Sequence, residues 1–461
     1  MMLGPDLDPG RQGIATSIER SESPLRTRLL ELKRQFNEKL DRDNPGEWLS
    51  WWIAEDAFEL PAPVIDKLRR GGEALEHFFR VANDLFYREP WIRRRLEKTI
   101  SPLYPLLNDA QPNSVPVMPR PDVVLDRNWR PRFVELELTV CARFDTAVMH
   151  EQYGLDPNGG LIKAYADYFK SRWPGKTLAL VTAPHPLWWY IVDEAIPFAA
   201  RLKREGVDAV VLEGSDLPNL RFDGHQLVLC GRDGIDKPIH VFDRFIDIYE
   251  LAELQHPGIV ALVDAYAVGA VESINTCKQF LDEKDWMALF WDPRLRQAWH
   301  DGLGAEYDAV LRELIPRTWR LTPDTEVELP SGRTLPARAL ADLPVQERGF
   351  LIKESGTSLS ASGAQSLAIL SELESDEART VLTERMDGHS PFVIQEIVES
   401  PRVSFTALNP NDNDAVVVQH GARMKFSVFY IAGRMTDIKF IASNAELAVN
   451  NRDCIEGIVR Y

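Results

Sequence analysis

The stretch RPDVVLDRNWRPRFVELE at residues 120–137 predicts two short β-strands joined by a turn over residues 126–131. Residues two apart in a strand share a face, so Glu135 and Glu137 are expected to project together, and pairing can bring Asp122 and Arg120 alongside them. Three carboxylates on one side of a hairpin suit Mg²⁺, and Arg120 suits an anion. The alternative is that these residues form the solvated face of an antiparallel hairpin. The residues alone do not decide between this interpretation and a metal site.

The segment that follows the hairpin has the alternating strand and helix pattern of a parallel sheet. Strands are predicted at residues 177–182, 208–212 and 240–245, with an amphipathic helix at 190–205. No GxGxxG follows the first strand of this Rossmann-like sheet, which removes the usual dinucleotide fingerprint. His185 and Asp243-Arg244 stand at strand ends, where α/β sheets commonly bind ligands. Arg244 is a candidate substrate ligand, and a structural ion pair is the alternative.

The N-terminal part is expected to begin with a loose tail at 1–22, rich in Gly, Pro, Ser and charge. Residues 23–112 have apolar side chains at helical spacing and predict a helical region. Trp48, Trp51 and Trp52 are expected to pack inside this helical cap rather than around a ligand.

The C-terminal part, from about residue 348, is rich in predicted strands, with one helix expected at 362–373. Its strand FLIK ends at Lys353 and is followed by the Ser- and Gly-rich run ESGTSLSASG, whose N–H and hydroxyl groups can surround phosphates. It is not a Walker A loop, because GxxxxGK[ST] is absent. A second strand, PFVIQEIV at 391–398, can present backbone groups to an adenine edge, and a plain sheet strand is the alternative. Lys278 opens a further predicted helix.

Together these motifs resemble the ATP-grasp superfamily, whose ligases, such as D-alanine–D-alanine ligase, have a metal hairpin of the form R-x-D followed by E-x-N. Here the hairpin precedes the Rossmann-like segment, an order similar to that of the circularly permuted group that includes eukaryotic-type glutathione synthetase and glutathionylspermidine synthetase. The resemblance implies an α/β (α+β) ATP-grasp fold with a metal-binding hairpin at 113–150, a Rossmann-like pre-ATP-grasp domain at 151–270 and nucleotide-binding subdomains at 271–461.

The resemblance also implies roles for individual residues. Asp122, Glu135 and Glu137 would hold one or two Mg²⁺ ions, and Arg120 would stabilise the oxyanion of an acyl-phosphate adduct. The residues implied to bind ATP are Lys278 and Lys353, the lid residues Ser355, Gly356 and Ser358, the hinge residues Gln395, Glu396, Ile397 and Val398, and Lys439. Arg423 is a further candidate for a phosphate or substrate.

The implied activity is ATP-dependent ligation of a small amino acid or peptide carboxylate to an amine, through an acyl phosphate. Two alternatives stay open: a small-molecule kinase of the same fold, and a scaffold that has lost catalysis. The absence of HExxH and GxSxG motifs weighs against a zinc protease and a serine hydrolase.

Composition narrows the class of protein. The chain has 461 residues and 53 Lys and Arg against 70 Asp and Glu, and its formal net charge of -17 argues against nucleic-acid binding. It has no apolar run long enough to span a membrane, no secretory signal pattern at its start, and four widely spaced cysteines. A protein of the reducing cytoplasm is therefore expected, with a homodimer as the default assembly.

Overall fold

The structure is a computed structural model of the chain. It describes residues 16–17, 27, 52–97, 101–138, 143–155, 160–182, 191–231, 235–247, 256–356, 359–361, 366–409, 415–444 and 454–461. Within these residues, no helix is both long enough and apolar enough to span a membrane.

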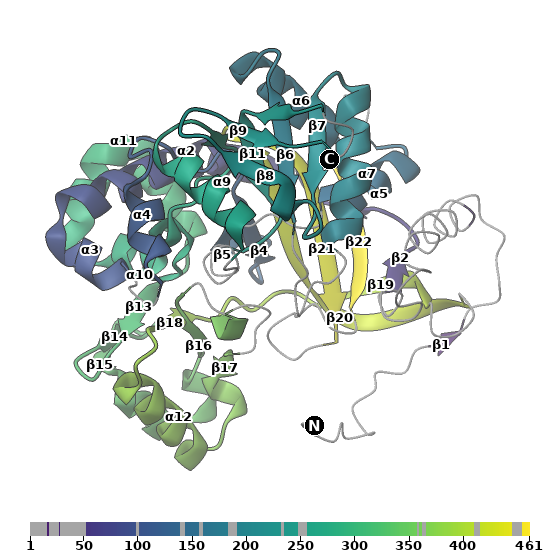
Figure 1. Cartoon of the computed structure of the whole chain (residues 1–461). Helices are drawn as coiled ribbons and strands as arrows, with labels where there is room; N and C mark the ends of the chain where they lie inside the picture. Colours follow the sequence, from purple (N-terminus) through teal and green to yellow (C-terminus); the bar gives the residue numbers. More distant parts are fainter. Residues whose placement is uncertain are drawn as a thin grey trace, which may run out of the picture.

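A nine-stranded sheet forms the centre of the molecule (Figure 1). Its main path runs through β19 (Val403–Asn409), β2 (Trp52–Ala54), β22 (Ile455–Arg460), β21 (Arg434–Ser443), β20 (Ala415–Ile431), β4 (Arg120–Leu125) and β5 (Pro131–Glu137). The short strands β1 (Thr16–Ser17) and β3 (Phe58–Glu59) pair with β20 and β22. Strands from both ends of the sequence therefore share one sheet.

The predicted hairpin is confirmed as β4 and β5. Arg120 lies opposite Glu137 and Asp122 lies opposite Glu135, with a bulge before Val123. The hairpin joins the C-terminal strands because Asp122 also pairs with Ser427 of β20. The sheet therefore brings together segments about 300 residues apart.

Helices cover the apolar face of this sheet. They are α2 (Ala62–Arg88), α3 (Pro90–Leu96), α10 (Asp285–Trp291) and α11 (Arg296–Leu314), whereas α4 (Leu103–Asp109) packs in a core of the parallel sheet described below. Val123, Phe133 and Phe426 from the sheet share a core with Phe78 of α2 and Trp299 of α11, whose rings stack with centroids 4.8 Å apart. Burial of these aromatic side chains fixes the helices against the sheet. Part of the other face packs against α5 (Arg143–Gln152), with Leu408, Val416 and Ile458 of the sheet in one apolar cluster with Val148 and Met149.

The predicted parallel sheet is also confirmed, in the order β12 (Glu272–Ser273), β11 (Val241–Arg244), β6 (Thr177–Val181) and β7 (Asp208–Leu212). The helices α5 (Arg143–Gln152), α6 (Gly160–Arg172), α7 (Ile191–Arg204) and α9 (Pro257–Ala267) accompany it. Apolar clusters form on both of its faces, one including Ile259 of α9 and one including Phe198 of α7. A small sheet of β8 (Leu220–Phe222), β9 (Leu227–Leu229) and β10 (Lys237–Ile239) lies beside it.

A separate lobe at the lower left of Figure 1 holds an antiparallel sheet. Its strands are β13 (Thr318–Leu321), β18 (Phe392–Glu396), β16 (Phe350–Glu354) and β17 (Ala368–Ile369), with α12 (Ser375–Asp387) beside them. The hairpin of β14 (Glu326–Glu328) and β15 (Thr334–Pro336) completes the lobe.

Two local predictions were wrong. The helix expected at 362–373 is instead β17 and a 3-10 turn at Leu370–Glu372, and the true helix starts at Ser375, where Asp376 and Glu377 favour its N-terminus. Leu370 is buried in the core of the lobe, so this apolar residue reflects tertiary packing and not the periodicity of a helix. Trp52 lies in strand β2 and not in a helix, although it does pack against the core that the helices share with the sheet. Trp48 and Trp51 lie outside the described residues.

Candidate functional site

Charged side chains gather on the polar face of the β4–β5 hairpin. Asp122 accepts from Lys425 Nζ at 2.6 Å and from Ser427 Oγ at 3.0 Å. Glu135 forms an ion pair with Lys284 at 3.0 Å. We call Asp122, Glu135, Lys284, Lys353 and Lys425 the lysine–carboxylate cluster.

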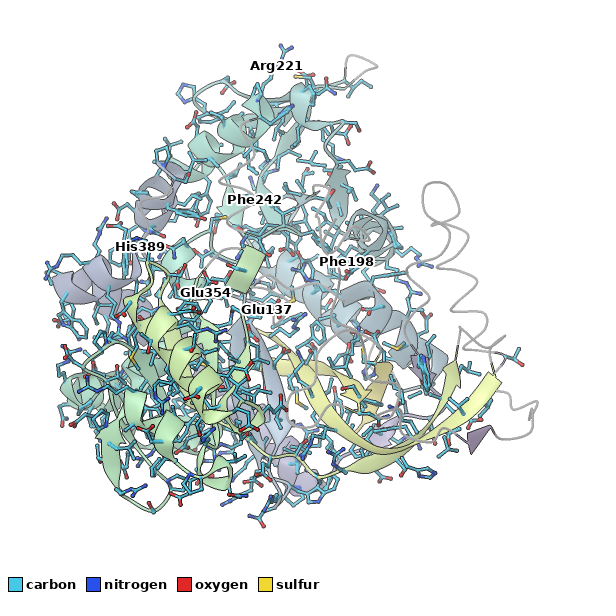
Figure 2. All side chains as sticks on the ribbon, turned by 90° about the horizontal axis from the view of Figure 1, so that it is seen from below. Glu137, Phe198, Arg221, Phe242, Glu354 and His389 are labelled. Atoms are coloured by element: carbon cyan, nitrogen blue, oxygen red, sulfur yellow. The ribbon has the colours of Figure 1, made fainter. Side chains whose placement is uncertain are left out.

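Lys353 connects the lobe to the hairpin. Its Nζ donates to the carbonyl of Val134 on β5 at 3.0 Å and to Oε1 of Gln395 at 3.3 Å. Figure 2 labels Glu354, the next residue of β16, and Glu137 of β5. The cluster therefore lies where the lobe meets the central sheet.

The positive charges of the three lysines repel one another. The pKa of Lys353 is lowered to about 8, mainly by burial and also by the neighbouring Lys284 and Lys425, against the opposing effects of Glu135 and Asp122. Burial opposes ionisation of Glu135, yet the three lysines lower its pKa to about 2. Three ammonium groups held this close favour an anion with several charges, such as a chain of phosphates.

Oxygen ligands for a metal are present but are not grouped as predicted. Asp122 is only 5% exposed and uses both of its oxygens on Lys425 and Ser427, whereas the side chains of Glu135 and Glu137 are 30% and 31% exposed. Within the described part of the chain, no three His, Cys, Asp or Glu side chains form a group that could hold a metal ion. Since Mg²⁺ is commonly held by one or two carboxylates together with substrate phosphates and water, Glu135 and Glu137 fit one such ion.

Arg120 lies next to this pair of glutamates. It forms an ion pair with Glu137, its cross-strand neighbour, and its side chain is 9% exposed. The predicted proximity of Arg120 to the hairpin carboxylates is therefore observed.

The structure places Lys278 away from the cluster, contrary to the expected phosphate contact. Its Nζ donates to Oδ1 of Asn83 at 2.6 Å and to the carbonyls of Pro112 and Ser114 at 2.7 and 2.8 Å. These three bonds use every proton of the ammonium group, and burial lowers its pKa to about 7. Lys284, six residues later, is the lysine that reaches the hairpin.

Sequence reasoning missed Lys284 and Lys425. Lys284 stands directly before α10 and also donates to the carbonyl of Ala361, in the 3-10 turn Leu359–Ala361 that follows β16. It therefore joins the predicted phosphate loop to the hairpin. The signal for Lys425 is the alternation of polar Arg423, Lys425 and Ser427 with buried residues along β20.

Lys439 and Arg423 share the face of the sheet that carries the cluster, but both are engaged elsewhere. Lys439 lies opposite Ser427 and donates to Asp145 at 2.6 Å and to Glu456 at 2.8 Å. Burial raises the pKa of Glu456 to about 7, against the effect of Lys439. Arg423 donates to the carbonyl of Ser400.

The predicted loop begins as a buried structural link. The hydroxyl of Ser355 donates to Glu283 at 2.9 Å and accepts from the backbone N–H of Asp285 at 2.9 Å. Gly356 is buried directly after it, and Ser358 lies outside the described residues. Ser355 therefore ties the end of β16 to the segment that carries Lys284.

The predicted hinge forms the end of β18. The amide of Gln395 donates to Thr318 at 3.1 Å, while its oxygen accepts from Lys353. Glu396 and Ile397 donate their backbone N–H groups to the carbonyls of Arg317 and Gly349, at 3.0 and 2.9 Å. Burial raises the pKa of Glu396, although nearby arginines oppose this. Val398 follows and is half-buried.

Arg244 lies at the carboxyl end of β11, as the strand pattern predicts. It is buried, donates to the carbonyl of Ile246 at 3.2 Å and lies 4.0 Å from Asp282. Asp282 in turn accepts from the backbone N–H of Leu138 at 3.2 Å, just beyond β5. The parallel sheet therefore approaches the same end of the hairpin as Arg120, while His185 lies outside the described residues.

No protein-family model matches this chain, and no curated protein sequence does so either. Among solved structures, the chain is similar to the glutathione synthetase-like effector from Globodera pallida in its apoform, with a TM-score of 0.56 and 10% identity over 95% of this chain and 98% of that one. A putative gamma-glutamylcysteine synthetase from Methylobacillus flagellatus KT is matched with a TM-score of 0.37 and 11% identity, over 84% of this chain and 87% of that one. The first likeness shows that a mixed α+β fold is shared over nearly the whole of both chains.

Proposed function

We propose that this protein is a peptide-forming ligase of the circularly permuted ATP-grasp type, which joins a small carboxylate to an amine at the expense of ATP. One observation carries the proposal: lysines from three separate segments converge on one hairpin, two of them on its carboxylates and Lys353 on the carbonyl of Val134. The fold shared with a glutathione synthetase-like protein supports it. The pairing of β4 with β20 supports the permuted order, since it returns the hairpin to the C-terminal strands.

The lysine–carboxylate cluster is the proposed phosphate site. Lys284, Lys353 and Lys425 neutralise phosphate charge, which is the main contribution that a protein makes to phosphoryl transfer. Glu135 and Glu137 are the proposed ligands of one Mg²⁺ ion, which, when bound, neutralises further phosphate charge. The segment from Gln395 to Val398, at the end of β18 and just beyond it, is the proposed adenine hinge, because Gln395 bonds to Lys353 in the same sheet.

The proposed reaction has two steps. A carboxylate oxygen of the substrate attacks the γ-phosphorus of ATP, the bond to the ADP oxygen breaks, and an acyl phosphate forms. The amine nitrogen then attacks the acyl carbon, phosphate leaves with the electrons of the broken C–O bond, and the nitrogen loses a proton. Arg120 is placed beside the metal ligands to hold the carboxylate and its oxyanion, a kind of contact whose loss typically costs about 10²–10³ in rate. Arg244, at the edge of the parallel sheet, is a second proposed substrate ligand.

Calorimetry with ATP and Mg²⁺, followed by assays of ADP release with mixtures of amino acids and amines, tests the proposal. The wild type is expected to bind ATP, and Lys284→Gln and Glu135→Gln are expected to bind it at least about tenfold more weakly. Lys163→Gln is the matched control, because Lys163 is exposed on α6 and pairs only locally with Asp167. ADP release that requires both an acid and an amine supports a ligase, whereas a stable phosphorylated acid formed without amine indicates the kinase alternative. A wild type that does not bind ATP excludes both enzymes and leaves the scaffold alternative.

A further inference from the structure

Lys425 is a cation that the hairpin itself holds in place. Its Nζ lies 2.6 Å from Asp122, and Ser427, two residues along the same strand face, donates to the other carboxylate oxygen at 3.0 Å. Asp122 is 5% exposed and Lys425 is 18% exposed. A charged pair this sheltered from water keeps its geometry better than a surface ion pair does.

This arrangement divides the three hairpin carboxylates into two kinds. Both oxygens of Asp122 already accept bonds, Oδ2 from Lys425 and Oδ1 from Ser427, so a metal ion would have to compete with these protein groups. Glu135 and Glu137, which are about one-third exposed, lie on β5, the edge strand of the sheet. The described residues accordingly contain no group of three potential metal ligands.

We propose that Lys425, fixed by Asp122 and Ser427, supplies a permanent positive charge to the phosphate site, so that the nucleotide is bound with one divalent cation rather than two. The inference rests on the proposed nucleotide-binding function and specifies how its charge is balanced. The single ion is assigned to Glu135 and Glu137.

Electrostatics favour one ion over two. Lys425, Lys353 and Lys284 all act on Glu135, so the positive charge that a second metal ion would bring is already present on the protein. A second divalent ion beside Asp122 would face Lys425 at close range and would be repelled by it. The ammonium group of Lys425 thus neutralises the charge of Asp122, as a second metal ion would otherwise do.

The test counts bound ions. Mn²⁺ is titrated by electron paramagnetic resonance into the full-length protein with a non-hydrolysable ATP analogue, and the tightly bound ions per complex are counted. We expect one ion in the wild type and in the control Lys163→Gln. In Lys425→Met, Asp122 is released to bind a second ion, so the count rises to two, and the analogue binds about 10- to 100-fold more weakly at limiting Mn²⁺. The double variant Lys425→Met/Asp122→Asn is expected to return to one ion.

The outcomes separate the two proposals. Two ions in the wild type with the analogue bound overturn the inference and leave the proposed function standing. A wild type that does not bind the analogue at all overturns the proposed function on which the inference rests. If Lys425→Met fails to fold, the wild-type count and the milder variant Ser427→Ala, expected to keep one ion, still decide the question.

Discussion

Replacement of Lys278 is expected to change the pH dependence of the protein's stability and to leave nucleotide binding unchanged. It is fully buried, and its three hydrogen bonds go to neutral oxygens of Asn83, Pro112 and Ser114. Replacing it by methionine removes the buried charge and keeps most of the side-chain volume. Lys278→Met should therefore bind ATP as tightly as the wild type does, whereas Lys284→Gln should bind it more weakly.

The sign and size of the effect follow from the lowered pKa. Burial lowers the pKa of Lys278 from 10.5 to about 7. Below about pH 7 the lysine is protonated in both states, and the folded protein bears the full cost of the buried charge. Between about pH 7 and pH 10.5 the folded protein loses this proton while the unfolded chain keeps it, so stability rises with pH. Each pKa unit is worth about 1.4 kcal/mol, which gives about 2 kcal/mol between pH 7 and pH 9.

Urea denaturation at pH 7 and pH 9 measures this difference. The free energy of unfolding of the wild type, relative to Lys278→Met, should increase by about 2 kcal/mol over this interval. Lys163→Met, at an exposed position on α6, should follow the wild type at both values. The reasoning would be refuted if the free energies of unfolding of the wild type and Lys278→Met changed equally between pH 7 and pH 9. That result would mean that the three hydrogen bonds offset the cost of burial completely.

Three further predictions concern the rest of the site and the core. Asp285→Asn should lower the free energy of unfolding by about 3–5 kcal/mol in denaturation experiments, because Asp285 is buried and pairs with two arginines. Gly72→Ala should cost about 1–3 kcal/mol in the same assay, since its new methyl group would overlap both the ring of Tyr430 and the backbone carbonyl oxygen of Gly433. ATP affinity measured by calorimetry should fall as the pH rises above about 8, where Lys353 loses its proton, and Lys353→Arg should abolish that fall. An unchanged slope in Lys353→Arg would assign the titration to another group.

Local patterns made the hairpin and the parallel strands predictable. Residues 120–137 combine period-two alternation with a turn, and both features depend only on neighbours in the chain. The helix expected at 362–373 was wrong because Leu370 owes its apolar character to the core of the lobe. Periodicity alone cannot distinguish these causes over so short a segment.

The charge partners were harder to predict because they are distant in the sequence. Lys425 bonds to Asp122 across 303 positions, and no spacing rule connects them. Lys278 and Lys284 are six residues apart in one segment, yet one is buried among neutral oxygens and the other meets Glu135. Only the packing of α2 and the hairpin against that segment decides which lysine faces the cluster.

The shared central sheet has a consequence for synthesis on the ribosome. The hairpin leaves the exit tunnel about 300 residues before its partner strand β20. Throughout that interval its unpaired edge and its apolar side are exposed, which invites pairing with other chains. Complete folding of the sheet is therefore expected to be late and slow, since it must close loops of several hundred residues. Chaperone contacts with the nascent chain should accordingly concentrate on residues 120–137 until β20 emerges.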